Sequence, residues 1–157
     1  MECAPTAGNT RFEKFAILSD EKKIKSLSDA VVEELLKNPA MKDQGEEEFA
    51  FLAKEFHSPI YYDAPHVIFV YTPFYFELGS LSGNQIRNII TYGRLAAHAL
   101  GLGTCWNGYT QIAMDSNSKI KRLAGITGKS IGVFTIGYPD LTFFRCPPRS
   151  QKRVKGL

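Results

Sequence analysis

The residues of this chain that could hold a ligand are concentrated between Leu95 and Tyr109, in the stretch LAAHALGLGTCWNGY. Gly101 is a natural helix terminator, because glycine adopts a left-handed backbone conformation without a steric penalty. Gly103 and Gly108 then leave the backbone bare enough for a flat ligand to lie against it. An ordinary helix end followed by a turn would also explain these glycines, and on the glycines alone that alternative is the better one.

A second group of residues with chemical potential lies in the C-terminal tail, where basic residues accumulate from Arg145 onward without an acidic one. Forked guanidinium groups such as those of Arg145 and Arg149 match the oxygens of a phosphate. Pro147 and Pro148 stand between them and would stiffen the segment. The alternatives are a solvated basic terminus and a nucleic-acid contact, and no fold signature or aromatic pattern supports the second.

The composition is that of an ordinary globular chain. Its 157 residues fit a single domain, 1–157, and 44% of them are apolar. A net charge of +3 is too small to indicate nucleic acid. We expect no membrane partner, because no apolar run is long enough for a span and no signal sequence is visible. The cysteines Cys3, Cys105 and Cys146 form no metal or cluster pattern and are typical of a reducing cytoplasm, so we expect a cytoplasmic protein without a metal site.

The elements that must position the candidate residues follow from the apolar pattern. Apolar runs predict strands at Lys14–Leu18, Val67–Tyr71 and Ile131–Tyr138. A helix is expected at about residues 21–37, where Ser19 or Asp20 can cap the first turn. Apolar residues at helical spacing predict a second, amphipathic helix within residues 39–62. Strands flanked by helices indicate an α+β layer arrangement.

A long central helix is expected to begin at Ser82–Asn84 and to lead directly into the glycine-rich stretch. Its apolar residues recur at spacings of three and four, which predicts one wide apolar face. The residues of that face are Ile86, Ile89, Ile90, Gly93, Ala96, Ala97 and Leu100. The segment after Gly101 is expected to be a small-residue loop.

The string LAAHALGLGTCWNG resembles the nitroreductase family of flavoenzymes, in particular the branch often fused to iron–sulfur ferredoxin domains. Four further blocks occur in the family's order: APTAGN at Ala4–Asn9, APHVIFVYTP at Ala64–Pro73, IGVFTIGYP at Ile131–Pro139 and RCPPR at Arg145–Arg149. The resemblance implies a nitroreductase-like α+β fold. Its central mixed or antiparallel sheet would be flanked by helices, with the long central helix at the interface of a homodimer.

The resemblance also implies that the cofactor is FMN and that two distant segments contact it. Pro5, Thr6 and Asn9 would reach the flavin ring, usually across the dimer interface. Arg145 and Arg149 would bind the phosphate. Relatives carry an upstream helix and an arginine–arginine–serine–x–arginine motif for this phosphate, and neither stands in this sequence. We therefore expect the two tail arginines to carry more of the phosphate binding here.

In the glycine-rich stretch, the resemblance places Cys105 and Trp106 at the floor of the flavin ring, and Asn107 and Gly108 on its N5 side. Trp106 could equally be an ordinary core residue. The variable middle of the chain, about residues 38–62, could form a lid over the substrate side, with Tyr61 and Tyr62 lining the pocket. An ordinary amphipathic helix is the alternative for this segment.

The activity that the resemblance implies is hydride transfer from NAD(P)H to N5 of FMN and onward to a nitroaromatic, a quinone or a similar acceptor. The chemistry would take place on the flavin, since no catalytic acid or base motif is visible. A ferredoxin is an alternative electron donor. Two other classes stay open: an FMN-binding protein with little or no turnover, and an interaction domain without flavin.

Overall fold

The computed structural model of this chain describes residues 1, 3–72, 79–141, 148 and 150. Within these residues, four strands form one antiparallel sheet in the order β1-β2-β4-β3. The strands are β1 (Lys14–Leu18), β2 (His66–Thr72), β3 (Gly103–Trp106) and β4 (Lys129–Gly137). Strands β1 and β3 are therefore the two edges of the sheet, and β2 and β4 form its centre.

The three strands predicted from apolar runs are confirmed as β1, β2 and β4, with small changes in length. Strand β2 is buried from Val67 to Val70 because elements cover both of its faces. Strand β3 corrects the sequence prediction, which expected a loop after Gly101. Although short and rich in small residues, this segment pairs with β4 from Gly103 opposite Gly137 to Trp106 opposite Phe134. Tertiary pairing thus outweighs the low strand propensity of glycine.

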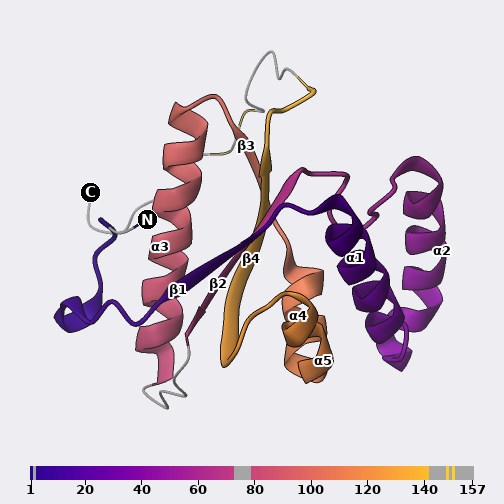
Figure 1. Ribbon diagram of the computed structural model, residues 1–157, viewed down its shortest axis with the longest axis horizontal. Coiled ribbons are helices and arrows are strands. Elements are labelled where there is room, and N and C mark those ends of the chain that lie inside the picture. Colours follow the sequence, from indigo (N-terminus) through magenta and orange to yellow (C-terminus); the bar gives the residue numbers. More distant parts are fainter. Residues whose placement is uncertain (2, 73–78, 142–147, 149, 151–157) are drawn as a thin grey trace.

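On one side of the sheet lie the helices α1 (Glu21–Leu35), α2 (Pro39–Glu55), α4 (Gly108–Ser116) and α5 (Ser118–Leu123) (Figure 1). The larger hydrophobic core lies between them and the sheet, and it includes Leu27, Val31, Phe69, Met114 and Val133. Helix α2 also confirms the amphipathic helix that was predicted within residues 39–62.

Helix α3 (Gly79–Ala99) lies on the opposite side, together with the N-terminal 3-10 turn η1 (Ala7–Asn9) (Figure 1). A second core lies under α3 and includes Ala4, Val70, Ile89 and Phe134. Gly132 of β4 is needed for this packing, because a Cβ there would collide with Cδ1 of Ile90. The sheet and α3 are therefore in close contact at one defined point.

Side-chain caps fix where α1 and α2 begin. The Asp20 carboxylate accepts a hydrogen bond from the Lys23 N–H at 2.9 Å, which satisfies one of the free donors of the first turn of α1. Asn38 caps α2 in the same way through the Ala40 N–H at 3.0 Å, and Pro39 follows it at the start of the helix. Because α2 starts there, α1 ends at Leu35, slightly earlier than predicted.

The end of α3 is set by Gly101, as predicted. Gly101 has a φ of +75°, and the N–H of Leu102 donates to the carbonyl of Ala97 at 2.9 Å, a common glycine-dependent helix ending. The predicted apolar face is only partly buried. Ile86, Ile89, Ile90 and Ala97 are buried, whereas Ala96 and Leu100 are exposed. The narrow sheet covers just one stripe of the helix, so the predicted face is wider than the contact.

Edge strand β1 leaves an apolar surface uncovered on the α3 side. Ala16 and Leu18 pack into the larger core, so Phe15 and Ile17 point to the other face of the sheet. Their exposed fractions are 37% and 65%. We call these two residues the β1 flank. None of the described helices combines the length and the apolar character needed to cross a membrane.

Candidate functional site

The turn from β3 into α4 contains four of the residues expected to contact the cofactor, Cys105–Gly108. Asn107 ends the strand and caps the helix: its Oδ1 accepts a hydrogen bond from the Thr110 N–H at 2.9 Å. Asparagine is among the preferred residues at such a position because its side chain replaces a missing backbone acceptor. The change from strand to helix is therefore fixed at Asn107, and α4 begins at Gly108.

Asn107 is itself buried, with an exposed fraction of 6%, and its other donors are also engaged. Its Nδ2 donates to the carbonyl of Ile60 at 2.6 Å, and its N–H donates to the carbonyl of Val133 at 2.8 Å. Asn107 thus holds the start of α4 against β4 through its backbone and against a distant loop through its side chain. This gives Asn107 a positioning role inside the protein, and its contact with a cofactor stays a prediction.

Gly108 and Tyr109 contribute the first two N–H groups of α4. N–H groups in the first turn of a helix have no partner inside the helix, and the helix dipole favours negative charge at this end. A Cβ built on Gly108 would meet nothing within 4 Å. The backbone is therefore open to close approach by a ligand, and a side chain at this position would occupy that space.

Cys105 and Trp106 project from opposite faces of β3, as successive residues of a strand do. Trp106 is half-buried and packs against the second core, where its ring lies close to the space above Gly132. Cys105 is exposed and makes no disulfide. The tryptophan is thus partly the core residue that the sequence left as an alternative, and part of its surface remains accessible.

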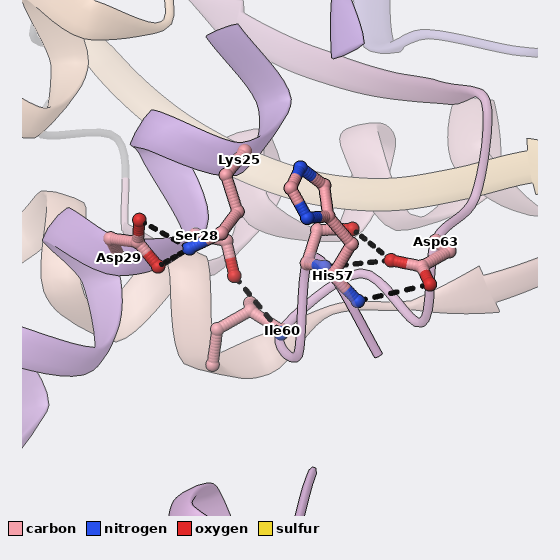
Figure 2. A network of polar contacts seen from close by, with 7 residues as sticks. Lys25, Ser28, Asp29, His57, Ile60 and Asp63 are labelled. Carbon is pink, nitrogen blue, oxygen red and sulfur yellow. Dashed lines mark hydrogen bonds and ion pairs between the residues drawn. The ribbon is translucent and has the colours of Figure 1, made fainter. Parts of the chain in front are cut away.

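The loop between α2 and β2 is held by the carboxylate of Asp63 (Figure 2). This carboxylate accepts hydrogen bonds from the His57 N–H at 3.1 Å and from the Ser58 N–H and hydroxyl at 2.6 and 2.9 Å. Burial would raise the pKa of Asp63, but the hydrogen bonds from Ser58 and His57 outweigh it and lower that pKa below its ordinary value. The loop is therefore fastened by a charged acceptor at neutral pH.

Ile60 connects this loop to two helices. Its N–H donates to the Ser28 hydroxyl of α1 at 3.2 Å (Figure 2), and its carbonyl accepts the bond from Asn107. The loop, α1 and the start of α4 are thus one hydrogen-bonded unit, although they are far apart in the sequence.

Tyr61 and Tyr62, both suggested as pocket residues, have different environments. Tyr61 is fully buried, and its hydroxyl lies 2.9 Å from the Thr110 hydroxyl. Burial raises the pKa of Tyr61. The suggestion was therefore wrong for Tyr61, which belongs to the core because its ring fills the space under the α4 cap. Tyr62 points outward and is 46% exposed.

The N-terminal segment with the other predicted contacts lies on the α3 side. Ala4 is buried in the second core, which holds the following residues against α3. Pro5 and Asn9 are exposed. Thr6 is half-buried, and its Oγ1 is a buried polar atom without a hydrogen-bond partner among the described residues. An unpaired buried hydroxyl costs free energy unless something else pairs with it.

Within one chain, the structure does not bring the two predicted groups of cofactor contacts together. The turn η1 and α4 lie on opposite sides of the sheet (Figure 1). Arg145 and Arg149, the predicted phosphate ligands, lie outside the residues that the structure describes. Among the described residues, the predicted contacts with groups open to a ligand are the turn Cys105–Gly108 and the unpaired Thr6 hydroxyl.

One polar contact near the turn was missed by sequence reasoning. The Tyr109 hydroxyl lies 3.3 and 3.4 Å from the two carboxylate oxygens of Glu48 in α2. The Tyr109 ring also packs edge-on against Phe49, with centroids 5.4 Å apart. No local pattern could have revealed this pair, because 61 residues separate Tyr109 from Glu48.

Comparison with known proteins agrees with this architecture. The model of the nitroreductase family matches residues 1–138. No curated protein matches the chain significantly. Among solved structures, a nitroreductase with bound FMN from Desulfitobacterium hafniense has a TM-score of 0.72 at 16% identity, covering 96% of this chain and 77% of its own. An FMN-bound nitroreductase from Bacteroides fragilis has a TM-score of 0.71 at 18% identity, with 99% and 79% covered.

A third similar structure is the FMN-dependent nitroreductase NfnB from Mycobacterium smegmatis in complex with NADPH. It has a TM-score of 0.64 at 16% identity, covering 88% of this chain and 73% of its own. At these identities the structures show a shared fold, and the family model extends over most of the sequence. The chain therefore belongs to the nitroreductase family and has a nitroreductase-like α+β fold.

Proposed function

We propose that this chain is an FMN-dependent oxidoreductase that passes hydride equivalents from NADH or NADPH to a small organic acceptor such as a nitroaromatic or a quinone. The observation that carries the proposal is the open backbone at the start of α4, beside Gly108, in a member of the nitroreductase family. FMN supplies the redox chemistry when it is bound, and the protein binds and orients it.

The residues of the turn would have distinct roles in binding FMN. The N–H groups of Gly108 and Tyr109 would donate to the flavin ring where negative charge develops on reduction. Asn107 holds these donors in place through its bonds to Thr110 and Ile60. Cys105, which projects on the α4 side of the sheet, would lie against the ring. Trp106 projects on the opposite side and would contact the flavin only past the open edge of β3. Donors fixed in advance need no rearrangement when the charge appears.

We further propose that two copies of the chain, each one domain of residues 1–157, complete the site as a homodimer. The support is that Thr6 and Gly108 lie on opposite sides of the sheet in one chain, so both can contact one flavin only if they come from different copies. Tyr92 and Leu95 on α3 are 45% and 63% exposed, and exposed apolar side chains of this kind are typical of interfaces. The cysteine pattern supports a cytoplasmic location.

A flavin titration tests the proposed cofactor and its phosphate contacts. Arg149→Ala should weaken FMN binding at least tenfold, since a hydrogen bond to a charged group is worth about 1.5–3 kcal/mol. Riboflavin, which lacks the phosphate, should bind the variant and the unaltered chain equally well. Lys152→Ala is the control and should change neither affinity. Flavin fluorescence follows both titrations in the apo-protein.

The other outcomes have separate meanings. Equal losses for both flavins would place Arg149 at the fold or the ring instead of the phosphate. Bound FMN without oxidation of NADH or NADPH, in the presence of a nitroaromatic or quinone, would mean a flavin-binding protein without turnover. No binding of either flavin would leave an interaction domain without flavin. The last two results would each contradict the proposed activity.

A further inference from the structure

Tyr62 is an exposed tyrosine next to the proposed cofactor site. Its ring packs edge-on against Phe56, with centroids 5.4 Å apart and planes at 88°. The loop that carries Tyr62 lies against the turn Cys105–Gly108, because the carbonyl of Ile60, two residues before Tyr62, accepts a hydrogen bond from Nδ2 of Asn107 at 2.6 Å. Since we propose that this turn holds the flavin, a molecule bound against the turn would be near the loop of Tyr62.

The backbone of Tyr62 has an unusual conformation that the loop maintains. The φ angles of Tyr62 and Asp63 are 51° and 53°, in the left-handed region that bulky residues rarely adopt. Such conformations persist where the surrounding structure enforces them, most often at functional sites. Here the Asp63 carboxylate enforces it by accepting hydrogen bonds from His57 and Ser58 (Figure 2). The loop thus fixes the direction in which the Tyr62 side chain leaves the backbone.

The Tyr62 hydroxyl is also free to donate. Among the residues that the structure describes, it has no hydrogen-bond partner. The neighbouring tyrosine hydroxyls do have partners: that of Tyr61 contacts Thr110, and that of Tyr109 contacts Glu48. Burial, Cys105 and Glu48 raise the pKa of Tyr62 above its ordinary value, and the nearby Tyr109 hydroxyl interacts with Tyr62 as well. Tyr62 therefore keeps its proton throughout the neutral pH range and above it.

We propose that Tyr62 donates a hydrogen bond, and then its proton, to a carbonyl oxygen of a quinone bound against the turn Cys105–Gly108. This inference rests on the proposed function and names the acceptor and a catalytic residue for that same site. NADH or NADPH supplies a hydride to the quinone by way of the cofactor. The O–H bond of Tyr62 breaks as the new O–H bond of the hydroquinone forms, and the Tyr62 phenolate then takes a proton from water.

Two acceptors separate proton donation from electron delivery. Menadione needs a proton at its oxygen, whereas ferricyanide accepts electrons without one. Tyr62→Phe keeps the ring and removes the hydroxyl, so it should lower kcat with menadione about 100-fold, the lower part of the range for a positioned proton donor. Ferricyanide reduction and FMN affinity should stay unchanged. Tyr138→Phe, at a tyrosine that is 85% exposed beyond β4, is the control and should change neither rate.

A chemical protection experiment tests contact without turnover. Tetranitromethane nitrates accessible tyrosines through their phenolate form, so the reaction is run in alkaline solution, and peptide mass spectrometry identifies which tyrosines react. In the oxidised FMN-loaded protein, menadione should protect Tyr62 from nitration and leave Tyr138 reactive. Equal nitration of Tyr62 with and without menadione would overturn the proposed contact.

The kinetic outcomes distinguish this inference from the function on which it rests. If the unaltered protein reduces both acceptors and Tyr62→Phe reduces menadione at the normal rate, the inference fails and the proposed function stands. If Tyr62→Phe loses both activities equally, Tyr62 supports the fold or the cofactor and is not the donor. If the unaltered protein reduces neither acceptor, the proposed function and this inference fail together.

Discussion

Thr6 combines an unfavourable environment in the isolated chain with a predicted role in binding. Its buried hydroxyl lacks a partner among the described residues, and such a group costs about 1–3 kcal/mol. Thr6→Val, which has nearly the same shape, should therefore keep or raise the free energy of unfolding of the apo-protein. The same change should weaken FMN binding about tenfold, because one hydrogen bond to the cofactor is lost.

Urea unfolding of the apo-protein and FMN titration measure these two effects separately. Thr127→Val removes the hydroxyl of an exposed threonine and serves as the control, with little expected change in either quantity. A less stable Thr6→Val variant with unaltered FMN affinity would show that the hydroxyl serves the fold.

The residue types at the turn were predictable, but their partners were not. The helix end at Gly101 was predicted correctly, whereas the contact of Asn107 and Gly108 with a cofactor stays a prediction. The carbonyl that Asn107 binds belongs to Ile60, which is 47 residues away, and the Glu48 partner of Tyr109 is farther still. Sequence patterns describe local geometry well, whereas these contacts depend on how the loop and α2 pack.

At the level of elements, a comparison of the two capping residues Asn38 and Asn107 measures how much the hydrogen bond from Asn107 to Ile60 contributes to the free energy of unfolding. Asn38→Ala removes an exposed cap of α2 and should lower the free energy of unfolding by about 1 kcal/mol. Asn107→Ala removes the cap of α4 and also leaves the Ile60 carbonyl without its donor. Its cost should therefore be larger, about 2–4 kcal/mol.

Urea denaturation gives both values, provided that the slope of the free energy against urea concentration is unchanged. Similar losses for the two variants would mean that the bond between Asn107 and Ile60 contributes little, and that the loop and α4 are less strongly coupled than the hydrogen bonds indicate.

The predictions of helices and strands were correct where the apolar pattern was strong. Lys14–Leu18 and the apolar run at Val67 became strands, and Gly101 ended α3. Strand β3 was missed because four residues with an exposed edge carry little apolar signal, and the pairing with β4 alone makes them a strand. The width of the apolar face of α3 was overestimated, since periodicity cannot show how much of a helix the sheet will cover.

For the whole molecule, the proposed sharing of the site between two copies predicts complementation. Thr6→Val and Gly108→Val should each weaken FMN binding, the second because a branched side chain enters open space at the turn. If the two chains are mixed and allowed to exchange subunits, half of the dimers are mixed, and each mixed dimer has one intact site. About a quarter of all sites should then regain normal affinity.

Equilibrium dialysis measures this recovery at an FMN concentration that loads the unaltered protein but neither variant. A double variant with both changes in one chain, mixed with itself, should recover nothing. The absence of any recovery in the mixture of the single variants, despite confirmed subunit exchange, would show that each chain binds flavin with its own residues.

The β1 flank has a practical consequence for the behaviour of the molecule in solution. Phe15 and Ile17 expose apolar surface at the edge of a sheet, and the attraction between such surfaces is entropic near room temperature. It weakens on cooling and strengthens in sulfate or phosphate, which are excluded from protein surfaces. Temperature and the buffer anion therefore set how readily copies of this chain associate. Solutions that are kept cold and free of sulfate should show the least association.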